Sequence, residues 1–144
     1  MKLFTIGYQA ATQGDVIGRL KAAGVAVLID VRAVAASRRP GFSKRLLAAG
    51  MADAGIDYVH LRALGTPAAG RAAARAGRTA EMRSIYTDYL DHEPAAETEL
   101  AQAQAIASAR PAALLCLEAD ARVCHRRLIA ERLRERAGFE VVDL

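Results

Sequence analysis

Apolar and polar positions follow two rhythms along the chain. Five short runs rich in apolar residues predict β-strands, since a strand covered on both faces of a parallel sheet has no polar face. Between these runs, apolar residues recur at three- and four-residue spacing, which is typical of amphipathic helices. The predicted strands cover residues 3–6, 25–31, 57–61, 112–117 and 139–143, and the predicted helices cover residues 15–23, 43–54, 80–90, 95–109 and 122–137.

Strands that alternate with helices predict an α/β fold. We expect three layers, with a mostly parallel five-stranded sheet and helices on both faces, in a single domain that spans residues 1–144. The glycine- and alanine-rich stretch 65–77 fits either an ordered loop or a short helix. Ligands of such sheets bind beyond the carboxyl ends of the strands, so residues that follow strands are the first candidates for a site.

Composition places the chain among ordinary globular proteins, with 53% hydrophobic and 25% charged residues. No apolar run approaches the roughly 20 residues needed to cross a bilayer, and the first residues lack the pattern of a signal peptide. A cytoplasmic location with no membrane partner is therefore expected. Two cysteines are too few for a disulfide framework, which leaves thiols, metal ligands or a transient redox pair.

The net charge of +4 is distributed unevenly. Residues 32–83 carry ten Lys/Arg against three acids, whereas residues 84–144 carry seven Arg against eleven acids. Arginine provides a planar fork that suits phosphate and carboxylate, so we expect a small anionic or nucleotide-like partner. A nucleic-acid partner is an alternative, although the scarcity of lysine and the acidic second half disfavour it. A GC-rich genome would also produce such an arginine bias.

The segment from residue 114 to residue 127 has the densest candidate chemistry. Cys116 and Glu118 follow the fourth strand, and Cys124 and His125 lie where the next helix begins. We predict catalytic roles for Cys116, Glu118 and His125, with Asp120 as the helix N-cap and His125 as a neutral imidazole. The alternative is that the cysteines are buried small apolar residues and that His125 is structural.

Asp30 is a second strong signal, because a carboxylate in a buried strand requires a partner. Arg32 lies two residues further along, on the same face of the strand. The pair is either an internal brace or part of the site, in which case Asp30 joins the catalytic candidates.

Further candidates lie in loops and at helix starts. Predicted ligand-binding residues are Tyr8, Arg32, Ser37, Arg38 and Arg126, and Glu118 is expected to pair with Arg32, Arg38 or Arg126. Arg71, Arg75 and Arg78 form either a basic flap or a solvated surface.

A metal site is the main alternative to a metal-free enzyme. Cys116, Glu118, Cys124 and His125, together with His60, offer thiolate, imidazole and carboxylate ligands for zinc or iron. The spacing lacks a Cys-x2-Cys pair, and the sequence identifies no cofactor, substrate or oligomeric state.

Six blocks together resemble the signature of one family, the domain of unknown function 488 (DUF 488). The blocks are residues 5–8, 28–32, 37–42, 58–61, 64–67 and 115–126. The resemblance implies a compact α/β bacterial or archaeal protein whose blocks form one polar pocket, without a settled activity.

A looser likeness is to rhodanese-type domains and cysteine phosphatases, because Cys116 and Arg122 have a Cys-x5-Arg spacing. Glu118 and Asp120 would lie where those enzymes bind an anion, which argues against that chemistry.

Overall fold

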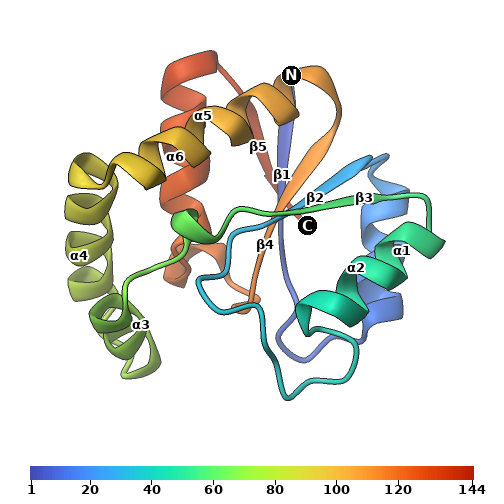
Figure 1. Cartoon of the computed structure of the whole chain (residues 1–144), viewed down its shortest axis with the longest axis horizontal. Helices are drawn as coiled ribbons and strands as arrows, with labels where there is room; N and C mark the ends of the chain where they lie inside the picture. Colours follow the sequence, from blue (N-terminus) through green and yellow to red (C-terminus); the bar gives the residue numbers. More distant parts are fainter.

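A five-stranded, all-parallel sheet forms the centre of the computed structural model, which describes residues 1–144 (Figure 1). The strand order is β3-β2-β4-β1-β5. The strands are β1 (Lys2–Gly7), β2 (Val27–Asp30), β3 (Asp57–His60), β4 (Ala112–Cys116) and β5 (Glu140–Asp143). The predicted α/β fold with five strands is confirmed, and every strand pair is parallel.

Helices cover both faces of the sheet, which gives the three predicted layers (Figure 1). One face carries α1 (Gln13–Ala22) and α2 (Lys44–Asp53). The other carries α3 (Ala68–Arg75), α4 (Thr79–His92), α5 (Pro94–Ala109) and α6 (Arg126–Ala137). The stretch 65–77 thus contains the short helix α3, which a turn follows. No helix of the chain is long and apolar enough to span a membrane.

Alternate strand residues divide between two hydrophobic clusters. In β1, Phe4 and Ile6 pack against α1 and α2, whereas Leu3 packs with the helices of the opposite face. Because successive side chains of a strand point to opposite faces, a strand between two helical layers must be apolar at nearly every position. This explains why the apolar pattern of the sequence predicts the buried strands.

The helix predicted over residues 122–137 begins later than expected. A 3-10 turn covers Ala121–Val123, Cys124 is extended, and α6 starts only at Arg126. The Asp120 side chain accepts a hydrogen bond from the backbone N–H of Arg122, so Asp120 caps the 3-10 turn and not α6. As a result, His125 lies immediately before α6 and not within it.

The end of β1 lies against the loop that follows β4. A Cβ atom added to Gly7 would lie 1.9 Å from the carbonyl oxygen of Glu118, far inside any van der Waals contact. The loop is also held by the backbone N–H of Gln9, which donates to the carbonyl of Leu117 at 2.8 Å. Glycine at position 7 therefore allows residues 117–119 to lie directly beside β1.

Candidate functional site

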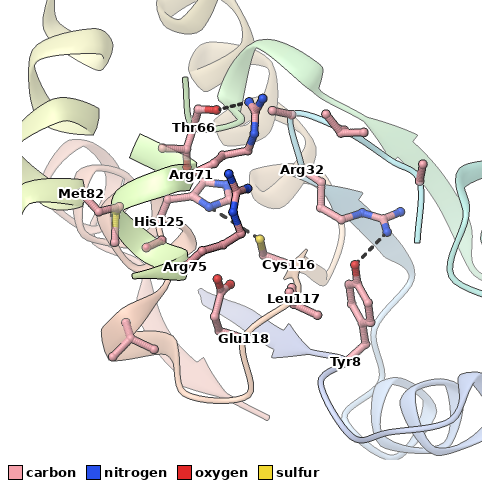
Figure 2. A pocket seen from close by; sticks show the side chains of 15 residues that line it. Tyr8, Arg32, Thr66, Arg71, Arg75, Met82, Cys116, Leu117, Glu118 and His125 are labelled. Carbon is pink, nitrogen blue, oxygen red and sulfur yellow. Dashed lines mark hydrogen bonds between the residues drawn. The ribbon is translucent and has the colours of Figure 1, made fainter. Parts of the chain in front are cut away.

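A cavity of about 460 Å³ opens beyond the carboxyl ends of β1, β2 and β4, the three central strands (Figure 2). Tyr8, Arg32 and Cys116 follow or end these strands and line the cavity. Helices α3 and α4 contribute Arg75 and Met82 to its wall. The volume is in the range of small-molecule sites. The pocket lies at the edge of the sheet at which parallel α/β folds bind ligands.

One side of the pocket is braced by a buried ion pair between Asp30 and Arg32. Arg32 Nε donates to Asp30 Oδ1 at 2.9 Å, and Arg32 Nη2 donates to Asp30 Oδ2 at 2.7 Å. The hydroxyl of Tyr58 also donates to Asp30 Oδ2. Asp30 is fully buried and does not line the pocket, so the structure places it as the brace of Arg32.

The other terminal nitrogen of Arg32 also has partners within the protein. Arg32 Nη1 donates to the hydroxyl of Tyr8 at 3.1 Å and to the carbonyl of Phe42 at 2.7 Å. The rings of Tyr8 and Phe42 stack with centroids 4.4 Å apart. Arg32 therefore forms a rigid wall of the pocket, and its charge is already neutralised by Asp30.

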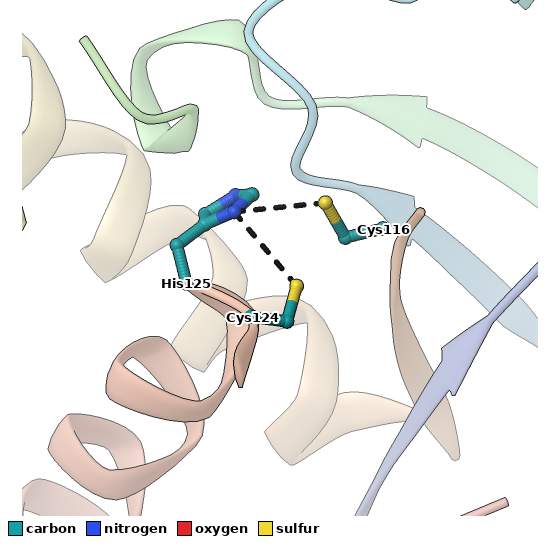
Figure 3. Close-up of side chains that lie close together, drawn as sticks. All are labelled: Cys116, Cys124 and His125. Atoms are coloured by element: carbon teal, nitrogen blue, oxygen red, sulfur yellow. Dashed lines mark hydrogen bonds between the residues drawn. The ribbon is translucent and has the colours of Figure 1, made fainter. Parts of the chain in front are cut away.

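The opposite side of the pocket contains a compact group of Cys116, Cys124 and His125 (Figure 3). His125 Nδ1 lies 3.6 Å from Cys116 Sγ and 3.9 Å from Cys124 Sγ. All three side chains are buried. Each offers one ligand atom, and these atoms lie within 4.8 Å of one another, so the group could hold a metal ion.

The proton of His125 is fixed by the backbone. His125 Nε2 lies 2.7 Å from the carbonyl oxygen of Val31, which only accepts hydrogen bonds, so Nε2 carries a hydrogen. Nδ1 therefore faces the two sulfur atoms. Burial opposes protonation, but Cys124 and the Val31 carbonyl outweigh burial and raise the pKa of His125. These two neighbours thus act against the neutral imidazole expected at a helix start, which stays a prediction.

The two thiols differ in their acidity. Burial acts to raise the pKa of Cys124, but hydrogen bonds from Cys116 and His125 and the charge of Arg126 outweigh it and lower the pKa. A hydrogen bond to Cys124, together with burial, raises the pKa of Cys116. Cys116 is nearer to the imidazole, but the pKa shifts of the two thiols have opposite directions, which makes Cys124 the more acidic of the two.

Glu118 enters the pocket without a partner for its carboxylate. Its Oε2 atom is buried and makes no hydrogen bond. Burial, followed by the proximity of Cys124, raises the pKa of Glu118 to about 7. The predicted pairing with Arg32, Arg38 or Arg126 is wrong, because none of them contacts this carboxylate. In Figure 2 the carboxylate points toward the region between Cys116 and Arg75.

Two arginines of α3 provide positive charge above this group (Figure 2). Arg71 and Arg75 are one helical turn apart and both line the pocket. Arg71 Nη1 donates to the carbonyl of Thr66 at 2.8 Å, and neither arginine forms an ion pair. With Arg32 neutralised, these two guanidinium groups are the uncompensated cations of the pocket.

Several predicted site residues lie outside the pocket. Arg126 is fully buried, and its Nη1 donates to the carbonyl of Glu118 at 2.6 Å, so it holds the loop after β4. Ser37 and Arg38 do not line the pocket: the Ser37 hydroxyl accepts from the backbone N–H of Arg39, and Arg38 is exposed. His60 Nε2 lies 2.8 Å from the carbonyl of Arg32, away from the cysteines.

The Cys-x5-Arg spacing forms no anion cradle. The side chain of Arg122 is 81% exposed and pairs with Asp120, so it does not approach Cys116. The pocket instead includes Thr66 and Met82, which the sequence interpretation did not select. Thr66 lies next to Pro67 and just before α3, and Met82 lies on α4, where nothing in the local pattern distinguishes it from a core residue.

The model of one protein family, described as domain of unknown function DUF488, matches residues 13–133. The chain belongs to this family. The DUF488 match covers α1 through most of α6 and so includes all of the pocket-lining segments except the end of β1. No curated protein and no solved structure matches the chain.

Proposed function

We propose that this DUF488 protein is an enzyme that acts on a small anionic molecule bound in the pocket. The observation that carries the proposal is that one cavity contains both two arginines without a counter-ion, Arg71 and Arg75, and a carboxylate without a partner, that of Glu118. Guanidinium groups bind phosphate or carboxylate by charge-assisted hydrogen bonds. Buried polar groups without partners are uncommon, and a ligand bound in the cavity would supply the contact that Glu118 lacks.

The proposed division of labour follows from position. Arg71 and Arg75 bind the anionic group, and the Arg32–Tyr8 wall limits its orientation. Glu118 lies on the opposite side, within the lining of the same cavity, where it would transfer protons. Most of the lining is apolar, which favours a compact organic anion over an extended polymer.

Anion binding tests the first part of the proposal. Inorganic phosphate, a nucleoside monophosphate and a small dicarboxylate are titrated by calorimetry into the wild type and the double variant R71A/R75A. We expect at least one probe to bind the wild type. Hydrogen bonds to charged groups contribute about 1.5–3 kcal/mol each, so the double variant should bind at least about 10-fold more weakly.

Arg45→Ala is the matched control, because Arg45 is exposed on α2 and lies outside the pocket. It should bind as the wild type does. Glu118→Gln should bind the anion more tightly, because a like charge is removed. Binding that persists in R71A/R75A, or no binding of any probe by the wild type, would refute the proposed site.

Turnover tests the second part. The compound that binds is incubated with wild type and with Glu118→Gln and followed by NMR. The proposal expects conversion by the wild type and at least about 100-fold slower conversion by the variant, as for the loss of an acid–base group. A compound that binds but is not converted would make the protein a binding domain.

A further inference from the structure

We propose that Cys116, Cys124 and His125 bind one Zn²⁺ ion at the floor of the pocket. The three ligand atoms come from the end of β4 and from the segment between the 3-10 turn and α6. Thiolate and imidazole together are the ligands that zinc prefers among common divalent cations. The site thus has three protein ligands of suitable type, brought together by the fold and not by a short Cys-x2-Cys motif.

The two nitrogen–sulfur distances within the group are close to those of a zinc centre. With Zn–S near ~2.3 Å and Zn–N near ~2.0 Å, the sulfur and nitrogen atoms of a tetrahedral site lie about 3.5–3.6 Å apart. His125 Nδ1 lies 3.6 Å from Cys116 Sγ and 3.9 Å from Cys124 Sγ. The third distance, between the two sulfur atoms, is at most 4.8 Å, against about 3.8 Å across a tetrahedral zinc centre. A metal ion therefore fits between the three atoms once the sulfur atoms move together by up to about 1 Å.

The backbone prepares His125 for this role. The Val31 carbonyl accepts the hydrogen of Nε2, which leaves the Nδ1 lone pair directed at the two sulfur atoms. Histidine ligands of metals are commonly oriented by such a hydrogen bond on the other ring nitrogen. The ring of Tyr86 also packs edge-on against the imidazole, with centroids 5.2 Å apart. The ligand orientation is therefore set before any ion binds.

The fourth coordination position faces the pocket. Cys116 and His125 line the cavity, whereas Cys124 is covered on its other side. Glu118 also lines the cavity but is not one of the three grouped ligands. Zinc sites with three protein ligands and an open position are typical of catalysis, whereas structural sites have four. Only this last assignment, a position open to substrate, rests on the proposed function.

Cobalt substitution tests the site directly. Co²⁺ is titrated into the purified full-length protein under a thiol-free reductant, and absorption is recorded. We expect one Co²⁺ per chain, with thiolate charge-transfer bands and the intense visible bands of tetrahedral cobalt, and displacement of Co²⁺ by one equivalent of Zn²⁺. Because metal binding requires deprotonated thiols, binding should release protons.

Variants identify the ligands. Loss of an outer contact alone weakens metal binding about 10–100-fold, so Cys116→Ser, Cys124→Ser and His125→Gln should each weaken it by at least about 100-fold. His60→Gln is the matched control, because His60 lies on the same sheet edge but outside the group. Circular dichroism of each variant, with Cys124→Ala as a second substitution at that position, shows whether the protein is still folded. Weak metal binding by a folded variant is then due to the lost ligand.

Glu118→Gln and added azide test the open position. The variant should bind Co²⁺ within about 10-fold of the wild type, and azide should shift the visible bands. A loss as large as that of the cysteine variants would instead make Glu118 the fourth ligand and refute the open position. Absence of stoichiometric binding, or binding that Cys116→Ser and Cys124→Ser do not change, would overturn the metal site while leaving anion binding by Arg71 and Arg75 unaffected.

Discussion

The two sides of the pocket treat their polar groups in opposite ways. On the side of β2, Asp30 and Arg32 bind each other and their neighbours, and every side-chain nitrogen and oxygen atom of the pair has a hydrogen-bond partner. On the side of β4 and α3, the Glu118 carboxylate has a buried atom without a partner, and Arg75 has no counter-ion. Buried polar groups are normally hydrogen-bonded, so the unsatisfied oxygen of Glu118 beside the cavity is the one that our proposal assigns to a ligand.

The comparison predicts its largest effect on stability at Asp30. Asp30→Asn removes the charge that neutralises Arg32 and leaves a buried cation, which costs about 3–5 kcal/mol. Urea unfolding followed by circular dichroism measures the loss. Asp57→Asn is the matched control, because Asp57 pairs with Arg110 at the surface and is 65% exposed, so its loss should cost at most about 1 kcal/mol. Equal losses in the two variants would mean that Arg32 is not dependent on Asp30.

A second effect is expected at the junction between the two sides. Gly7→Ala places a Cβ against the Glu118 carbonyl and forces the loop after β4 away from β1. Such overpacking costs about 1–3 kcal/mol, and the displaced loop should also weaken the cobalt site. Gly18→Ala, on the exposed surface of α1 with open space around its Cβ, should instead stabilise the protein by about 0.5–1 kcal/mol. A harmless Gly7→Ala would show that the loop can move freely.

The fold was largely predictable because its determinants are local. Strands such as Val27–Asp30 are buried on both faces, so the apolar pattern identifies them without knowledge of their partners. The start of α6 was not predictable, because the propensities of the neighbouring residues do not indicate the extended conformation of Cys124. A periodic pattern continues through residues 122–125 even though the backbone is not α-helical there.

The site was predictable where a charged residue lies within an apolar segment of the sequence. The position of Asp30 in an apolar strand predicted a buried partner for its carboxylate, and Arg32 is that partner. Arg126 has the same donors as a ligand-binding arginine, but it donates them to the backbone carbonyls of Glu118 and Ala119. Only the fold shows which of the two roles an arginine has. Arg71 and Arg75 remained ambiguous for the same reason, since their exposure to a pocket depends on where α3 lies.

On the side of the pocket that contains Glu118, we expect an effect of pH on the stability of the metal-free protein. The pKa of Glu118 is raised from about 4.5 in the unfolded chain to about 7, mainly by burial, so the folded state retains a proton that the unfolded state loses. Stability should therefore fall as pH rises from 4.5 to 7 and then level off.

Glu118→Gln isolates this contribution, because glutamine cannot ionise. With a chelator present, the variant should be more stable than the wild type at pH 8 by about 1–3 kcal/mol and equal to it near pH 4, since each pKa unit corresponds to about 1.4 kcal/mol. Urea unfolding at a series of pH values measures the difference. A constant difference across the series would mean that Glu118 ionises as freely as in the unfolded chain.

The smallest effect on stability is expected at Arg75, where the effect on binding should be largest. Arg75 is exposed, makes no hydrogen bond or ion pair, and lies in the last turn of α3, so Arg75→Ala should change the free energy of unfolding by no more than about 0.5 kcal/mol. The same substitution should clearly weaken anion binding measured by calorimetry. Asp30→Asn should show the reverse order, a large loss of stability, so the two variants separate a brace from a binding group. If Arg75→Ala destabilised the protein as much as it weakened binding, the difference between the two sides of the pocket would not exist.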